Sequence, residues 1–367
     1  MSPTKQSIIE ALRTVIDPDL RRDLVSLGMI HDLAVDGGRV SVRVELTTPA
    51  CPLKAQIQAD VERALRGVPG VTETAVSMSA RTTTSRAPEK ADRLPGVKNV
   101  IAVASGKGGV GKSTVAVNLA IALREAGASV GLLDADIYGP SVPIMLGMKD
   151  QRPMVNEHQQ IVPPNRYGID TISMGFLLKD TDAVVWRGPM LGKALQQFIE
   201  DVEWGEKDYL VVDLPPGTGD VQLSLTQLIP VSGTVIVTTP QDVAFADVLR
   251  AIRMFNMTNT PLLGVVENMA FFRCPDNGKD YFIFGEGRTA QSCEQYGLEL
   301  LARLPLDMVV APSADRGVPA IIAEPGGDQA TRYRALAAKV ASLQSILNAE
   351  KATGPKFDAF FGGPAKA

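Results

Sequence analysis

The chain shows two patterns of hydrophobic positions, and one gives way to the other near residue 98. Before that point, single apolar side chains alternate with polar ones or recur at helical spacing. After it, short and wholly apolar runs are separated by helical segments. Alternation is typical of half-buried strands, whereas continuous apolar runs are typical of strands covered on both faces. The pattern therefore predicts a small α+β domain followed by a larger α/β domain.

The first pattern predicts a sheet of short strands with amphipathic helices. In residues 39–46, RVSVRVEL, every second side chain is apolar, and these apolar side chains share one face, as in a half-buried strand. Strands are expected at 29–35, 39–46 and 71–78, and helices at 4–16 and 53–65. A compact α+β unit of this kind can form its own core.

The second pattern predicts a mostly parallel sheet with helices on both faces. Its apolar runs fall at 101–104, 130–133, 209–212, 234–237 and 262–266. The proline-rich stretch 142–170 is expected to be irregular, with a hairpin about 154–162. In such a sheet, ligands bind at the carboxyl ends of the strands.

These patterns divide the chain into four parts. Residues 1–80 form the α+β domain, and the polar stretch 81–97 with its two prolines is a linker. Residues 98–347 form the α/β domain, ending in an amphipathic helix. The Gly- and Pro-rich residues 348–367 are expected to be a flexible tail.

Residues 101–118, IAVASGKGGVGKSTVAVN, predict a phosphate-binding loop between a strand and a helix. The pattern G-x-x-x-x-G-K-S is met by Gly106, Gly111, Lys112 and Ser113. Glycines let backbone N–H groups close around phosphate oxygens, and the helix N-terminus favours an anion. Lys112 is expected to reach the β- and γ-phosphates, and the Ser113 hydroxyl to bind Mg²⁺. The expected nucleotide contacts are Gly106, Lys107, Gly108, Gly109, Val110, Gly111, Lys112, Ser113 and Thr114.

The loop contains a second lysine, Lys107, which a generic phosphate loop does not need. GKGGVGKST resembles the deviant Walker A motif of the SIMIBI ATPases, which include MinD, ParA and nitrogenase iron protein. The resemblance implies that Lys107 crosses a homodimer interface to the partner's nucleotide and contributes to catalysis. From the residues alone, such a cation could neutralise transition-state charge or simply be a solvated lysine on the rim.

Three aspartates follow apolar runs after the loop. Asp134 and Asp136 lie in DADIYGPS, and Asp213 begins DLPPGTGD. Asp213 resembles the Walker B acid that holds Mg²⁺, and Asp136 resembles the switch I carboxylate that places the attacking water. Asp134 is expected to support the Mg²⁺ shell. A single aspartate at a strand end can also be only a turn or cap residue. Asn268, after the run 262–266, resembles the adenine-contacting asparagine of the same ATPases.

The insertion 270–295 begins AFFRCPDN and places Cys274 four residues after the start of that segment. It is similar to the Mrp/Nbp35 (ApbC-like) family, whose members carry Cys-x-x-Cys here. That resemblance implies a [4Fe–4S] cluster held between two protomers. In this chain Asn277 occupies the second cysteine position, so the missing ligands would come from Cys51, Cys293 or a partner protein.

The N-terminal domain carries Cys51 in the segment TTPACP. Together with Asp17-Pro18-Asp19 and Val25-Ser26-Leu27-Gly28, it resembles the MIP18-like domain of iron–sulfur assembly factors. Cys51 is expected near a helix N-terminus, where a thiolate is favoured. A small buried hydrophobe is the equally weighted alternative, and Cys293 could as easily be packed in a helix.

Composition narrows the classes of function. The net charge of −4 does not favour non-specific binding to nucleic acid or to acidic membranes. No apolar run is long enough to span a bilayer. Three scattered cysteines do not make a disulfide framework, so a reducing cytoplasm is expected.

The motifs together predict an ATPase that carries iron–sulfur clusters. We expect ATP, Mg²⁺ and a [4Fe–4S] cluster as ligands, and a second copy, a scaffold protein and recipient apoproteins as partners. The alternative is a positioning ATPase like MinD or ParA without metal chemistry, which would need a basic membrane-binding helix or DNA-binding face. A redox enzyme like nitrogenase iron protein is a third hypothesis, but it would need four cluster cysteines in the dimer.

Overall fold

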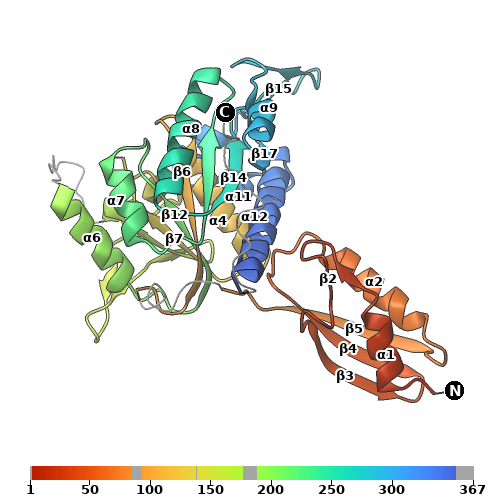
Figure 1. Cartoon of the computed structure of the whole chain (residues 1–367). Coiled ribbons are helices and arrows are strands. Elements are labelled where there is room, and N and C mark those ends of the chain that lie inside the picture. Colours follow the sequence, from red (N-terminus) through yellow and green to blue (C-terminus); the bar gives the residue numbers. More distant parts are fainter. Residues whose placement is uncertain (1, 85–92, 138, 177–187, 353–367) are drawn as a thin grey trace. The chain divides into compact units, whose positions relative to one another are not determined.

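The computed structural model describes residues 2–84, 93–137, 139–176 and 188–352 (Figure 1). The chain divides into two compact units. One comprises residues 1–85 and 341–355, and the other comprises residues 86–340 and 356–367.

The smaller unit is built on a three-stranded sheet of order β3-β4-β5. Its elements are α1 (Lys5–Leu12), β1 (Ile16–Asp17), β2 (Arg22–Asp23), β3 (Ile30–Asp36), β4 (Arg39–Leu46), α2 (Lys54–Arg66) and β5 (Glu73–Ala80). Strands β3 and β4 are antiparallel, and β4 and β5 are parallel. Val40, Val42 and Val44 of β4 are buried in one core with Ile57 and Val61 of α2. The period-two alternation of β4 therefore marks the face that the helices cover, as expected.

The larger unit contains an eight-stranded sheet of order β10-β11-β7-β12-β6-β13-β14-β17. Its strands are β6 (Val97–Ser105), β7 (Val130–Asp134), β10 (Asn165–Arg166), β11 (Ile169–Ser173), β12 (Lys207–Asp213), β13 (Gly233–Thr238), β14 (Leu262–Glu267) and β17 (Leu300–Arg303). Neighbouring strands are parallel except β10 and β11. The expected fold class, a mostly parallel sheet covered by helices and preceded by a small α+β domain, is confirmed.

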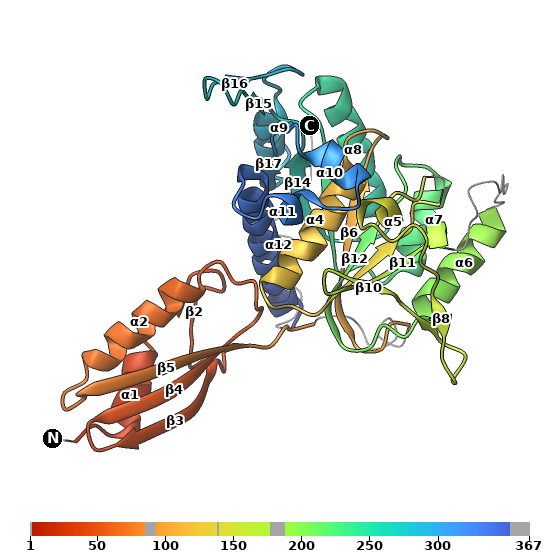
Figure 2. The same cartoon turned by 180° about the vertical axis from the view of Figure 1, so that it is seen from behind.

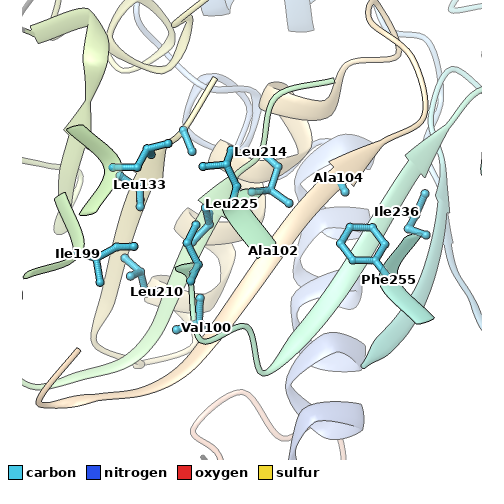
Figure 3. Packing of buried hydrophobic residues seen from close by; sticks show 14 of the residues in the cluster. Val100, Ala102, Ala104, Leu133, Ile199, Leu210, Leu214, Leu225, Ile236 and Phe255 are labelled. Atoms are coloured by element: carbon cyan, nitrogen blue, oxygen red, sulfur yellow. The ribbon is translucent and has the colours of Figure 1, made fainter. Parts of the chain in front are cut away.

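Helices cover both faces of this sheet. The helices of this unit are α4 (Lys112–Glu125), α5 (Val142–Met145), α6 (Gly188–Glu200), α7 (Asp220–Leu228), α8 (Asp242–Met257), α9 (Thr289–Gln295), α10 (Val310–Asp315), α11 (Ala320–Ala323) and the part of α12 (Asp328–Ala352) up to residue 340, with a 3₁₀ turn η1 (Met174–Phe176). Figure 1 shows α6, α7 and α8 on one side, and Figure 2 shows α4, α5 and α11 on the other. Val100, Ala102 and Ala104 of the central strand β6 pack in the core with Leu210 of β12 (Figure 3).

The larger unit also contains two short hairpins that are not part of the eight-stranded sheet. Strands β8 (Met154–Val155) and β9 (Ile161–Val162) are antiparallel, which confirms the hairpin expected about 154–162. Strands β15 (Phe272–Arg273) and β16 (Asp280–Tyr281) form the second hairpin, which contains Cys274.

The structure bears on the expected C-terminal tail and describes only part of the expected linker. Helix α12 continues to Ala352 and Asn348 is buried, so residues 348–352 are helical and not part of a flexible tail as expected. The rest of that tail, and residues 85–92 of the expected linker, lie outside the described residues.

Candidate functional site

The phosphate-binding loop lies between β6 and α4, at the carboxyl end of the central strand. Strand, loop and helix follow in the predicted order. Gly109 and Gly111 have φ angles of 79° and 81°, a left-handed conformation that favours glycine. A Cβ on Gly111 would also lie 2.2 Å from Nδ2 of Asn268, so this position has no room for a side chain. Lys107 is half-buried on the loop, and its action on a partner's nucleotide stays a prediction.

Lys112 is the centre of a buried charge cluster. Its Nζ donates to Asp213 Oδ1 at 2.6 Å and lies 3.6 Å from Asp136 Oδ2. It also donates to Ser113 Oγ at 3.3 Å. Lys112 is 6% exposed. The fold therefore brings together four residues: Lys112, which the sequence analysis assigned to the phosphates, Ser113 and Asp213, assigned to Mg²⁺, and Asp136, assigned to the attacking water.

Asp134, the last residue of β7, holds the segment that carries Asp136. Its Oδ1 accepts a hydrogen bond from the backbone N–H of Asp136 at 3.1 Å. Its Oδ2 accepts one from the hydroxyl of Ser173 at 2.8 Å. Ser173 ends the neighbouring strand β11 and is buried. Sequence analysis missed Ser173 because IDTIS is too polar to register as an apolar run; the only signal was a hydroxyl after Ile172.

Burial controls the protonation of these carboxyl groups. Burial, together with repulsion from Asp213, raises the pKa of Asp134 to about 8. Burial also raises the pKa of Asp213, and the ammonium group of Lys112 opposes that shift. With one cation among three carboxyl groups, the cluster has an excess of acidic groups.

The cluster fits a hard divalent cation. Among the described residues, Asp136 Oδ1 and Asp213 Oδ2 are buried without a hydrogen-bond partner. Buried polar atoms are rarely left unpaired, so these oxygens point to a missing ligand. Carboxylate and hydroxyl oxygens are the groups that Mg²⁺ binds. Asp213 and Ser113 therefore fit a nucleotide-bound Mg²⁺, and Asp136 Oδ1 lies unpaired in the same cluster.

Asn268 lies directly against the loop. It follows β14, and its Nδ2 donates to the carbonyl oxygen of Val110 at 2.8 Å. Its side chain is 8% exposed. The structure therefore places Asn268 beside the phosphate-binding loop, and its contact with adenine stays a prediction.

Cys274 is held in the β15–β16 hairpin. Its backbone N–H donates to Lys279 O at 2.9 Å, and its carbonyl oxygen accepts from Gly278 N–H at 2.9 Å. The side chain is half-buried and free of any disulfide. Asn277, in the second cysteine position, donates through Nδ2 to the hydroxyl of Tyr281 at 3.2 Å.

The other two cysteines differ from Cys274. Cys293 is 1% exposed in the hydrophobic core, and burial, with Glu267 and Glu299, raises its pKa to about 11. Cys293 is therefore a packed core residue, which was the alternative to its role as a cluster ligand. Burial, with Asp19 and Asp17, also raises the pKa of the Cys51 thiol. The expectation that its position before α2 favours a thiolate is therefore wrong, because the loss of hydration outweighs the hydrogen bond from the Leu53 N–H. Over the described ranges, no three His, Cys, Asp or Glu side chains are grouped to hold a metal ion.

A glycine loop between the central strand and a helix, with acids from the neighbouring strand ends, defines the class of P-loop NTPases. Residues 96–341 match the family described as "NUBPL iron-transfer P-loop NTPase", and residues 5–78 match "Iron-sulfur cluster assembly protein". The chain therefore belongs to the NUBPL family of iron-transfer P-loop NTPases, with an N-terminal domain of the iron–sulfur assembly type. The resemblance drawn from the sequence is confirmed.

Relatives and solved structures agree with this assignment. An iron-sulfur cluster carrier protein of Deinococcus radiodurans is 54% identical over 340 residues, which cover 93% of this chain and 95% of the relative. A nucleotide-binding protein of Archaeoglobus fulgidus in complex with ADP is 40% identical, with a TM-score of 0.55 over 62% of this chain and 89% of that one. The cell division ATPase MinD of Pyrococcus furiosus is 21% identical, with a TM-score of 0.50 over 67% of this chain and 99% of MinD, which shows the shared fold alone.

Across the part of the chain that the structure describes, none of the helices is both long and apolar enough to cross a bilayer.

Proposed function

We propose that this chain binds and hydrolyses Mg²⁺–ATP and carries an iron–sulfur cluster as cargo for recipient apoproteins. The observation that carries the proposal is the buried cluster of Lys112, Asp136 and Asp213 at the glycine loop. The carrier role is supported by family membership and by the relative named as a cluster carrier.

The loop residues bind the nucleotide in this proposal. Backbone N–H groups of residues 106–114 enclose the phosphates, and Lys112 donates to phosphate oxygens in place of Asp213. Ser113 and Asp213 hold Mg²⁺, and Asp134 supports them through the segment that carries Asp136. Mg²⁺ neutralises charge on the phosphates. Asn268 contacts the adenine.

Hydrolysis is assigned to three side chains of this chain. The unpaired Oδ1 of Asp136 is free to accept a hydrogen bond from the attacking water and to orient it. Lys112 stabilises negative charge on the transferred group. Lys107 of a second copy completes this stabilisation, which makes the active form a homodimer.

Cys274 is the proposed cluster ligand, because its thiol is free and its side chain is only half-buried. Each copy of the chain would contribute one Cys274 to a [4Fe–4S] cluster, and a scaffold or recipient protein would contribute the remaining ligands. Cys293 is a poor ligand, because its raised pKa opposes the thiolate that iron requires. Cys51 remains a second candidate. Free thiols fit a reducing compartment such as the cytoplasm.

Two measurements on the full chain test the proposal. Lys112→Ala should abolish ATP turnover, whereas Lys98→Ala, at a lysine that pairs with Asp208 outside the cluster, should leave it unchanged. Anaerobic reconstitution should load iron and sulfide, and Cys274→Ala should lower the iron content while Cys293→Ala should not. Wild-type protein that neither hydrolyses ATP nor retains iron would refute the proposal.

A further inference from the structure

A short segment joins the nucleotide loop to the hairpin cysteine. Residues 268–273, here called the connector, begin at Asn268, whose Nδ2 donates to Val110 O in the loop. They end at Arg273, directly before Cys274. A contact with the loop and the candidate cluster ligand are therefore only six positions apart in the sequence.

The connector is fastened to the segment that follows β17. The backbone N–H of Ala270 donates to Leu304 O at 2.9 Å, and the N–H of Leu306 donates to Phe271 O at 2.7 Å. Phe272 also forms a bridge with Leu306. A displacement of the connector must therefore be shared with residues 304–306 or break these hydrogen bonds.

Two guanidinium groups lie close to the ring of Phe271. Arg273 Cζ is 5.5 Å and Arg332 Cζ is 5.2 Å from the ring centroid, within range of cation–π attraction. The ring is 7% exposed. Arg332 is itself held by Asp328 at 2.8 Å and by the carbonyl oxygen of Arg303 at 3.1 Å. The ring thus ties the connector to α12.

Arg273 connects Phe271 to the hairpin that contains Cys274. Its guanidinium donates two hydrogen bonds to Asp280 across the hairpin, at 2.7 and 3.0 Å. The next residue, Cys274, donates its N–H to Lys279 O. The orientation of the hairpin, and with it the surroundings of the thiol, therefore depends on how Phe271 and Arg273 are held.

The start of the connector is conformationally strained. Met269 has a φ angle of 55°, a left-handed conformation that is uncommon for a residue other than glycine. It directly follows Asn268, so this strain is maintained beside the hydrogen bond to the loop. A phosphate ligand and Asn268 would contact the same loop, so a ligand that binds one arrangement of the loop and the connector more tightly would favour that arrangement.

We propose that Phe271 is a positioning residue for Cys274, and that through the connector the occupancy of the nucleotide loop changes the accessibility of the Cys274 thiol. The inference rests on the proposed nucleotide binding, but not on cluster binding. In this proposal, ATP binding at the loop affects the candidate cluster ligand through residues 268–273. Phe271 acts through its stack with Arg332.

The test is the alkylation rate of Cys274 in the full-length, reduced, cluster-free chain. Iodoacetamide labelling is followed by peptide mass spectrometry without nucleotide, with Mg²⁺–ADP and with a non-hydrolysable ATP analogue. The wild-type rate should differ between nucleotide states by about five-fold or more. Phe271→Ala and Arg332→Ala should each reduce this ratio to less than about two-fold, without a matching loss of nucleotide affinity.

Three controls separate positioning from general damage. Phe271→Tyr keeps the ring and should restore the wild-type ratio. Arg334→Ala removes an arginine of the same helix that pairs with Glu125, and should also keep it. Cys51 labelling within each sample should be the same in wild type and variants.

The outcomes also separate this inference from the proposed function. The inference alone would be overturned if nucleotide bound without any change in the alkylation rate of Cys274. It would also be overturned if Phe271→Ala and Arg332→Ala both kept the wild-type ratio of alkylation rates between nucleotide states. Failure of the wild-type chain to bind nucleotide would overturn both.

Discussion

Gly111→Ala tests how closely Asn268 packs against the phosphate loop. A methyl group at position 111 meets two obstacles. The residue has a φ angle of 81°, which an L-residue with a Cβ adopts at a cost. The new Cβ would also lie 2.2 Å from Asn268 Nδ2, well inside contact distance. Asn268 must therefore move and lose its hydrogen bond to the buried carbonyl of Val110.

The two costs can be separated. The left-handed conformation costs about 1–2 kcal/mol in a residue other than glycine. Loss of the hydrogen bond leaves Val110 O unpaired, which costs about 1–3 kcal/mol. We therefore expect Gly111→Ala to lower the free energy of unfolding by about 2–5 kcal/mol in the wild-type background. In an Asn268→Ala background only the first cost of about 1–2 kcal/mol remains, because the obstructing side chain is gone.

Urea unfolding of wild type, both single variants and the double variant gives this cycle. Trp204 is buried in the core of the larger unit, so its fluorescence reports the unit that contains the loop. The expected interaction energy is about 1–3 kcal/mol. Equal costs of Gly111→Ala in both backgrounds would show that Asn268 does not limit the space at the loop.

Three further predictions concern the charge cluster and the thiols. Ser173→Ala should lower kcat for ATP hydrolysis more than it raises KM, because Asp134 loses the hydroxyl that orients it, and Ser173→Thr should retain activity; equal activity in both variants would contradict this. Burial raises the pKa of Asp134 from 3.8 to about 8, so the folded chain keeps a proton that the unfolded chain releases. The stability of the nucleotide-free, Mg²⁺-free chain should therefore fall from about pH 4 to about pH 8, with a smaller fall in Asp134→Asn. Because Cys293 is buried and its pKa is about 11, its thiol in the native chain should be alkylated far more slowly than that of Cys274. Comparable alkylation rates would show that the Cys293 thiol is accessible in solution.

Local chemistry was sufficient to predict much of this protein. The apolar runs located β6, β7, β12, β13 and β14, because a strand buried on both faces needs apolar side chains on both. The glycine loop was predictable because left-handed turns and anion-binding helix ends require particular residues at fixed spacing. The helices of the smaller unit followed from side-chain periodicity. In each case the determining interactions lie within a few residues along the chain.

By contrast, the partners of the site residues were decided by the tertiary structure. Strand order places β11 beside β7, which brings Ser173 to Asp134, and places β12 beside β6, which brings Asp213 to Lys112. Asn268 meets a loop 158 residues away, and Phe271 meets Arg332 of α12. The raised pKa of the Cys51 thiol likewise depends on burial, because Cys51 packs against a core to which residues far from it in the sequence contribute. Periodicity along one segment carries no information on which segments become neighbours, because that depends on how all the apolar faces are buried together.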